Sequence, residues 1–319
     1  MKKWTGRAVV FPASIIPAGV LIAIAAIFIA GCGLFSKTRT ETNQLYKGLE
    51  DSKGSLTKIL AVLPFENDGQ WSGVDLETPL LKDLKYSIEK ECRHVRVLLP
   101  DTSGYPARFK ELERGEDGNV DNYTLALTGR ASGINMVLSG RLIAIRHIAE
   151  NRGILWWAGI HHTARLQMEF AVFHTGTGAK LFDETVIKDI EIDESEGLRI
   201  EEYDMPDTVP LTDTLADISE TVGEIGDTVF EFIPWEAYVA SVDGGRIVLS
   251  SGGAIGLKEG KNLDVFSADQ VTKGKAGQRF FMEGVKIGTI TLTKIYSDRS
   301  EALLKEGGPI PPGSAARLP

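Results

Sequence analysis

The sequence predicts an α+β domain followed by a small all-β domain, on three observations. Residues 58–65 form a short, uninterrupted apolar run, and a helical stripe of apolar residues follows it. Residues 161–174 alternate apolar and polar side chains, and a glycine-rich turn after them should return the chain along 180–192. After Trp235 the chain changes to short strand-like runs separated by glycines. These patterns favour a mixed sheet with helices on one face, and then a small barrel.

Strands and helices are expected to alternate in the first half of the α+β domain. The run at 58–65 is typical of a strand buried on both faces. A helix is expected from Thr78-Pro79, because apolar residues then recur at helical spacing. A second strand is expected at 95–99, a helical turn near 108–113 and a helix at 123–132. The stripe of the first helix comprises Leu80, Leu81, Leu84, Ile88 and Cys92.

Three further strands should complete this sheet. Residues 135–148 alternate loosely, and Gly140 marks an expected bulge. Residues 161–174 alternate well, and the turn at 175–178 should return the chain along 180–192 as a hairpin. The apolar face of the middle strand is formed by Ala164, Leu166, Met168, Phe170 and Val172.

The segment between sheet and barrel combines an acidic loop with a helix. Residues 193–210 are acidic with few apolar side chains, which predicts a loop or linker. Residues 211–232 place apolar side chains three and four apart, which predicts an amphipathic helix weakened by Gly223 and Gly226 and stopped by Pro234. The barrel strands are expected at 237–242, 246–250, 263–267, 285–295 and 300–304.

The amino terminus predicts export and lipid attachment. Residues 1–7 are basic and residues 8–30 are apolar, as in an export signal. Ile29-Ala30-Gly31-Cys32 closes this run and resembles the lipobox of bacterial lipoproteins. The resemblance implies cleavage before Cys32 and attachment of fatty acyl chains such as palmitate to it. The alternative is an uncleaved signal anchor, because the run reaches the roughly 20 apolar residues of a membrane helix.

The resemblance also implies a location and a layout. Gly33 stands where inner-membrane lipoproteins usually carry an aspartate, which implies the periplasmic face of the outer membrane in a diderm bacterium. The expected segments are a signal peptide at 1–31, a flexible tether at 32–57, the α+β domain at 58–209, a connecting helix at 210–234 and a small SH3-like barrel at 235–319.

Composition narrows the possible partners. The 319 residues suit about two domains. The net charge is −9, and it would be −12 without residues 1–31, which hold only basic charges. An acidic body argues against nucleic acid as a partner, and membrane contact should come from the lipid. With Cys32 acylated, Cys92 would be the only free thiol, so no intramolecular disulfide is expected.

Two stretches resemble known envelope proteins. The KILAVLPF strand and the FHTGTG turn at 173–178 resemble the amino-terminal domain of TolB, the secretion lipoprotein CsgG and the middle domain of the flagellar assembly protein FlgT. Residues 237–266 (AYVASVDGGRIVLSSGGAIGLKEGKNLDVF) and 284–304 (GVKIGTITLTKIYSDRSEALL) are similar to the carboxy-terminal module of FlgT. The resemblance implies a TolB/CsgG-like sheet, a barrel, and a structural or assembly role.

The sequence offers no motif for catalysis, so no enzymatic activity and no cofactor besides the lipid are expected. It lacks the nucleophile-elbow, P-loop and dinucleotide fingerprints. His147, His161 and His162 could meet at one end of adjacent strands as metal ligands, but without ligand spacing they favour local bonding. The acids clustered in 183–196 lack calcium-loop spacing and favour a solvated face. The glycines at 252–256 precede no helix, which argues against a phosphate cradle.

An apolar segment between two expected strands is the candidate contact surface. Leu155, Trp156 and Trp157 lie where a hairpin connection is normally polar. They either cap the core or meet another protein or the membrane interface.

The leading hypothesis is an outer-membrane lipoprotein that acts as an assembly factor through periplasmic or outer-membrane protein partners. The alternative is an oligomeric secretion channel like CsgG, which leaves a homo-oligomer open. A hydrolase or sugar-binding module is a third option that no motif supports.

Overall fold

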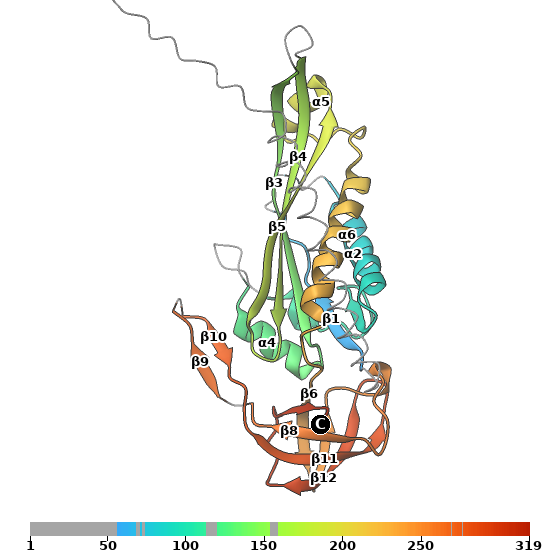
Figure 1. Ribbon diagram of the computed structural model, residues 1–319, viewed down its shortest axis with the longest axis vertical. Coiled ribbons are helices and arrows are strands. Elements are labelled where there is room, and N and C mark those ends of the chain that lie inside the picture. The colour runs from blue at the N-terminus through green and yellow to red at the C-terminus, as the bar shows by residue number, and fades with distance from the viewer. Residues whose placement is uncertain are drawn as a thin grey trace, which may run out of the picture. The chain divides into compact units, whose positions relative to one another are not determined.

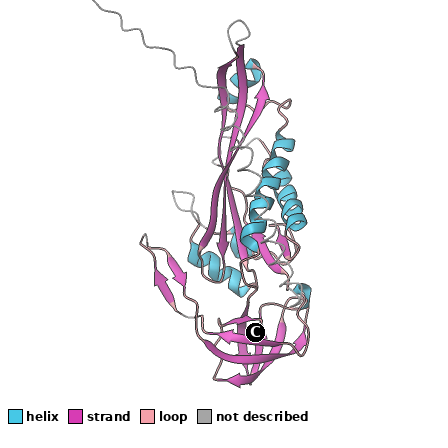
Figure 2. Cartoon of the chain, viewed as in Figure 1, coloured by secondary structure: helices cyan, strands magenta, loops and turns pink. Residues whose placement is uncertain are grey.

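A computed structural model describes residues 56–67, 71, 74–112, 120–153, 159–268, 270–275 and 277–319. Leu56–Pro319 form one compact unit that combines a mixed sheet, helices and a closed barrel (Figures 1 and 2). The expectation of an α+β domain with a small barrel is confirmed. Residues 1–55, with the expected signal peptide, lipobox and nearly all of the tether, lie outside the described residues. The domain boundaries expected at 209 and 234 stay predictions.

The sheet has five strands, and its mixed character is confirmed. The parallel part is β2-β1-β3, formed by β1 (Lys58–Val62), β2 (Val95–Leu98) and the first residues of β3 (Met136–Arg152). The sheet continues antiparallel through β4 (Gly159–His174) and β5 (Lys180–Ile192). β3 and β4 stay paired from Met136↔His174 to Arg152↔Gly159, so they form one long hairpin.

Helices cover both faces of the sheet, and the expectation of one covered face was wrong. α2 (Glu77–Glu91) and α6 (Leu211–Phe230) pack on one face, whereas α3 (Ala107–Lys110) and α4 (Asn122–Ala131) pack on the other. The reason is the apolar run of β1, whose successive side chains point to opposite faces. Leu60 and Val62 join the core under α2 and α6, while the core under α3 and α4 takes Ala61 and Leu63.

α6 packs closely against α2, and Gly223 permits this. A Cβ added at Gly223 would lie 3.1 Å from the backbone carbonyl carbon of Ser87 on α2. The helix ends at Phe230, which is buried, and Phe232, which the sequence placed on the apolar stripe, is exposed. The buried Lys58 ammonium donates to the carbonyl oxygens of Phe230 (2.8 Å) and Glu231 (3.1 Å), where a cation complements the helix dipole.

Gly140 is not a bulge, contrary to expectation. It pairs directly with Phe170, and the register is irregular instead between Leu142 and Ala144. A Cβ at Gly140 would lie 2.2 Å from Cζ of Phe65, whose ring meets that of Phe170 edge-on at 5.7 Å. The glycine therefore makes room for a packed aromatic ring.

The segment 193–210 is not only a loop. It contains α5 (Glu194–Glu201), which begins with a capping box. The Asp193 carboxylate accepts from the amide of Glu196 (2.8 Å), and the Glu196 carboxylate accepts from the amide of Asp193 (2.8 Å). α5 has few apolar residues because it buries mainly Gly197 and Ile200 against the long hairpin.

The carboxy-terminal part forms a closed barrel, with strand order β11-β12-β7-β6-β13-β8. Its core includes Ile247, Leu249, Leu263, Val265 and Ile290. A separate hairpin of β9 (Val271–Lys273) and β10 (Arg279–Phe281), which was not expected, leaves the barrel after β8. The barrel strands are β6 (Ala237–Asp243), β7 (Arg246–Leu249), β8 (Asn262–Phe266), β11 (Lys286–Ile295), β12 (Ser300–Gly307) and β13 (Ala315–Arg317).

Candidate functional site

The site residues expected from the sequence all lie outside the described residues. These are the lipobox Ile29, Ala30 and Gly31, the lipidation site Cys32, and the apolar contact segment Leu155, Trp156 and Trp157. The last three belong to the connection between β3 and β4, and the neighbouring Ile160 is exposed. Their roles therefore stay predictions.

His147 and His162 do meet, near the far end of the long hairpin. His161 does not join them, and its side chain is exposed. The rings are almost coplanar, with an interplanar angle of 13°, and Nε2 of His147 lies 2.8 Å from Nδ1 of His162. Nδ1 of His147 lies 2.9 Å from the Glu201 carboxylate, to which it donates. Both nitrogens of His147 are thus engaged. Among the described residues, no group of three or more His, Cys, Asp or Glu side chains could hold a metal ion.

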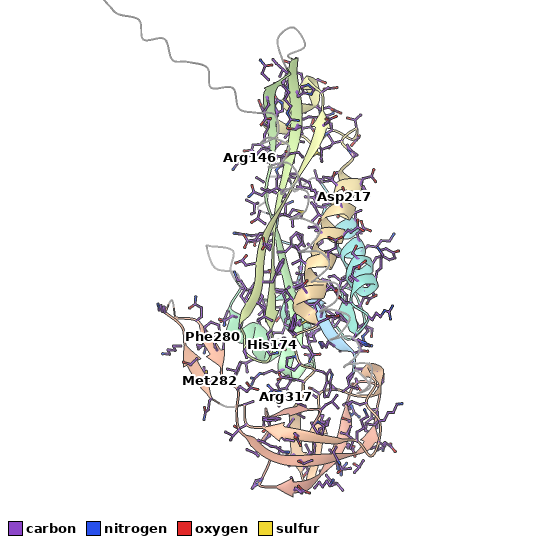
Figure 3. The ribbon with its side chains drawn as sticks, in the orientation of Figure 1. Arg146, His174, Asp217, Phe280, Met282 and Arg317 are labelled. Atoms are coloured by element: carbon purple, nitrogen blue, oxygen red, sulfur yellow. The ribbon has the colours of Figure 1, made fainter. Side chains whose placement is uncertain are left out.

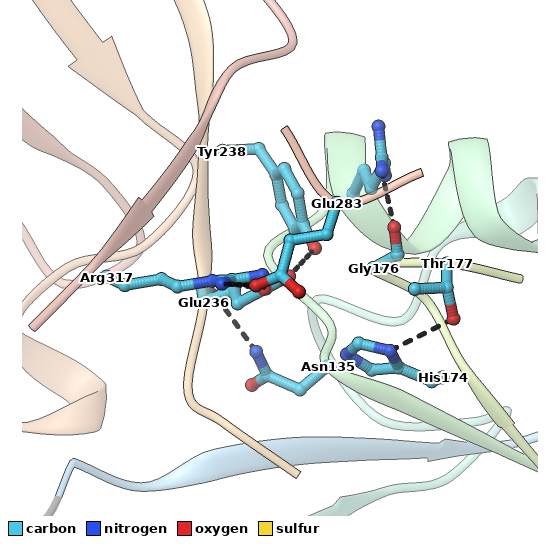
Figure 4. A network of polar contacts seen from close by, with 9 residues as sticks. Asn135, His174, Gly176, Thr177, Glu236, Tyr238, Glu283 and Arg317 are labelled. Carbon is cyan, nitrogen blue, oxygen red and sulfur yellow. Dashed lines mark hydrogen bonds and ion pairs between the residues drawn. The ribbon is translucent and has the colours of Figure 1, made fainter. Parts of the chain in front are cut away.

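A network of polar contacts lies between the sheet and the barrel, and we call it the junction (Figure 4). It consists of Arg130, Asn135, His174, Gly176, Thr177, Glu236, Tyr238, Glu283 and Arg317. Asn135 connects the two parts through its amide. Its Oδ1 accepts from the backbone amide of Ile59 on β1 (3.0 Å), and its Nδ2 donates to the carbonyl oxygen of Glu236 ahead of β6 (2.8 Å).

The Glu236 carboxylate is the charge centre of the junction. Glu236 is only 2% exposed, yet its carboxylate accepts from the Tyr238 hydroxyl and from Arg317, whose Nε lies 2.6 Å away. Arg317 also pairs with the exposed Glu283. Burial, and then the Glu236 charge, raise the pKa of Tyr238 well above its usual value, so the phenol stays protonated as a donor.

Arg130 brings α4 into the same junction. Its guanidinium donates to the carbonyl oxygens of Ala268 (3.0 Å) and Gly176. It also lies over the ring of Phe281, 3.6 Å from the centroid, and 5.1 Å from the centroid of Tyr238. Burial lowers the pKa of Arg130, but an arginine remains cationic at neutral pH. One side chain thus ties α4 to the turn after β4 and to the barrel.

The β9–β10 hairpin docks on the sheet side through its backbone and aromatic rings. Phe281 stacks on Tyr123 of α4 with centroids 5.0 Å apart, and its amide donates to the carbonyl oxygen of Thr177 (2.9 Å). The Asn122 amide donates to the carbonyl oxygen of Arg279 (2.7 Å). Phe280 on β10 and Met282 just beyond it mark this hairpin in Figure 3.

His174 fills the space beside the Glu236 carboxylate. A Cβ added at Gly176 would lie 2.5 Å from Cε1 of His174 and 2.6 Å from Oε2 of Glu236, so only glycine fits between them. Burial lowers the pKa of His174, and the cations of Arg317 and Arg130 lower it further against the raising effect of Glu236. The imidazole is therefore neutral at pH 7.

The Asn135 amide and the Glu236 carboxylate are hydrogen-bonded across the junction, whereas Nε of the buried Arg130 guanidinium has no hydrogen-bond partner in the described structure. The FHTGTG turn, quoted above for family resemblance, forms part of the junction. The sequence did not single out Arg130, Glu236 or Arg317, because they lie far apart in the chain. The available signal was weak: Glu236 stands between Trp235 and an apolar run, where a charge needs a buried partner.

Comparisons with known proteins give no family assignment. No family model matches the sequence. No curated protein matches it either. The solved structures similar to it include the hypothetical protein CT253 from Chlamydia trachomatis, with 10% identity over 54% of this chain and 97% of that one and a TM-score of 0.35.

Two further solved structures show a likeness of the same order. The PelC dodecamer from Paraburkholderia phytofirmans has 12% identity over 53% of this chain and 86% of that one, with a TM-score of 0.30. Lipoprotein GNA1162 from Neisseria meningitidis has 11% identity over 52% of this chain and 99% of that one, with a TM-score of 0.31. These likenesses are too slight to assign a fold family or a function to this chain.

Replacing Arg317 with methionine should destabilise the fold by about 3–5 kcal/mol, because it leaves the buried Glu236 carboxylate without its cation. Urea denaturation measures this change in the free energy of unfolding. Arg246→Met, which breaks the exposed ion pair with Glu301 at 3.7 Å, is the control and should cost less than about 1 kcal/mol. Adding Glu236→Gln to Arg317→Met should recover part of the loss. Equal losses in the two single variants would contradict the role given to Arg317.

Acid should destabilise the protein partly through His174. Because its pKa is lowered in the folded state from the ordinary 6.5, the unfolded chain binds the proton first as the pH falls below that value. The resulting loss in the free energy of unfolding is absent at pH 7 and grows below pH 6.5, by at most about 1.4 kcal/mol per pH unit. Urea denaturation between pH 7 and pH 5 should show a shallower loss for His174→Gln than for the exposed control His161→Gln. Identical slopes would show that His174 is protonated without penalty.

Proposed function

We propose that the protein is a lipid-anchored envelope protein of a diderm bacterium, held at the periplasmic face of the outer membrane. It acts there as a structural or assembly factor through protein–protein contacts, without catalytic activity or a cofactor of its own. The observation that carries this proposal is Ile29-Ala30-Gly31-Cys32 at the exit of the apolar amino-terminal run. Acylation of Cys32 would anchor an acidic body whose charge opposes direct adhesion to anionic lipid.

The junction supports an assembly role. A factor that positions partners needs binding surfaces whose spacing does not change, and the buried contacts of Asn135, Arg130 and Glu236 connect the sheet to the barrel inside one compact unit. The order of a long-hairpin sheet followed by a barrel is also compatible with the resemblance to TolB, CsgG and FlgT. That resemblance favours flagellar, secretion or other envelope assemblies as the setting.

The second candidate is an oligomeric secretion channel like CsgG, and the length of the β3–β4 hairpin favours it. Each strand has more residues than the 9–11 that cross a bilayer. The far end of the hairpin, however, carries exposed charged or titratable side chains at Arg146, Glu150, Arg152 and His161. A bilayer-facing strand needs an apolar outer face, so the assembly role is favoured. Within the described part of the chain, no helix is both long and apolar enough to span a membrane.

Lipid attachment at Cys32 is tested by substitution. Wild-type protein expressed in a diderm host should incorporate labelled palmitate and fractionate with the outer membrane, since a lipidated cysteine is its proposed anchor. Cys32→Ala should lose both properties, and Cys92→Ala should keep both. A wild-type protein that keeps its uncleaved amino terminus and incorporates no palmitate would instead establish the signal anchor.

Partner capture tests the assembly role. Crosslinking followed by affinity purification from envelopes should recover a defined set of proteins with the wild type, because tryptophans contribute strongly to interfaces. Trp156→Ala/Trp157→Ala should lose part of that set. Trp4→Ala, in the segment expected to be removed, is the matched control. Recovery of the same proteins by all variants would return the two tryptophans to a core-capping role, and voltage-dependent conductance in planar bilayers would favour the channel.

A further inference from the structure

A cleft of about 540 Å³ opens between the β2 edge of the sheet and the barrel, on residues that the junction does not use. The sheet side contributes β2, the loop after it and the turn after α4. The barrel side contributes the loop after β7 and the turn between β11 and β12. The volume lies in the range of small-molecule sites.

A half-buried cation without a described partner lines this cleft. Arg96 belongs to β2, and among the described residues its guanidinium forms no hydrogen bond or ion pair. Lys85 of α2 also lines the cleft, and its only described ion-pair contact is with Glu89 at 4.0 Å. A guanidinium held in a concave site is suited to a carboxylate or phosphate, which it binds through two parallel N–H donors.

The barrel wall adds an unpaired buried hydroxyl. Ser251 is 4% exposed and lines the cleft, and its Oγ has no hydrogen-bond partner in the described structure. The loop after β7 is held by close contacts, so it cannot easily move to supply a hydrogen-bond partner for this Oγ. The Ser300 hydroxyl donates to the Ser251 carbonyl oxygen (2.8 Å), and a Cβ at Gly252 would lie 2.3 Å from the carbonyl oxygen of Tyr296. Such a hydroxyl is normally satisfied in a native protein, and a bound oxygen could satisfy it.

Two other kinds of occupant fit less well. A phosphate cradle made of backbone amides is not available, because the amides of Gly253 and Ala254 already donate to Tyr296 (2.7 Å) and Ser297 (2.9 Å). A peptide strand added at the β2 edge would lack one backbone donor, because the Val97 amide already donates to the Glu89 carboxylate (2.9 Å).

We propose that this cleft binds a small anionic polyol, namely a sugar acid or a sugar phosphate. Arg96 binds the anionic group, with Lys85 nearby. Ser251 and the exposed hydroxyls of Ser103 and Ser297 meet the hydroxyls of the ligand. The open space at Gly104, where an added Cβ would meet nothing within 4 Å, leaves room for substituents. Because both the sheet and the barrel line the cleft, the ligand contacts both parts. This inference does not rest on the lipid anchor or on an assembly role.

The test measures the binding of glucuronate and of glucose 6-phosphate to the full chain in detergent. Ligand-observed NMR detects binding, and calorimetry gives the Kd. At least one probe should bind saturably, and neutral glucose should bind at least about tenfold more weakly, because it lacks the anion that Arg96 pairs with. Arg96→Gln should weaken binding by about tenfold or more, a change of one decade in Kd. The control Arg93→Gln removes the same charge from an exposed neighbouring position and should leave Kd unchanged.

Ser251→Ala separates binding from folding. It should weaken probe binding while the urea midpoint stays the same or rises, because it removes an unpaired buried hydroxyl. Cys32→Ala should bind the probes as the wild type does, which keeps this test distinct from that of the anchor. Absence of saturable binding by both probes, equal binding of glucose, or equal Kd values for Arg96→Gln and Arg93→Gln would each overturn the proposal.

Discussion

The buried Glu236 carboxylate is the constraint on which the arrangement of sheet and barrel depends. A carboxylate removed from water is costly unless opposite charge and hydrogen bonds replace the solvent. Tyr238 and Arg317 supply these from the barrel. Gly176 supplies the space from the sheet side, and His174 stays neutral there. The chain therefore satisfies one charge with groups from both parts.

Much of the sheet and barrel could be predicted, because their signals are local. The apolar run at 58–65, the stripe of the first helix and the alternation along 161–174 are each periodic patterns within one element. Burial of β1 on both faces also had a local signal in this run, but which helix covers which face was not predictable, since it depends on where each crossover connection passes. α5 had a local signal, Asp193 with Glu196, that its polar composition obscured.

The candidate site was less predictable than the fold, for a physical reason. Arg130, Glu236 and Arg317 come together only after α4, the start of the barrel and β13 are folded, and nothing in their spacing links them. The cleft at Arg96 and Ser251 is likewise formed by separate loops. The lipobox is the opposite case, because it is a contiguous motif recognised in the unfolded chain; its role stays a prediction outside the described residues.

The position of Arg317 on β13 has a consequence for cooperativity. β13 pairs with β6 on one side and with β8 on the other, so the barrel is closed only when this strand is seated. The same strand delivers the cation that Glu236 requires. A molecule with β13 detached would have both an open barrel and an uncompensated charge facing the sheet. Barrel closure is thus coupled to attachment to the sheet, and the two parts should melt in a single transition rather than in sequence.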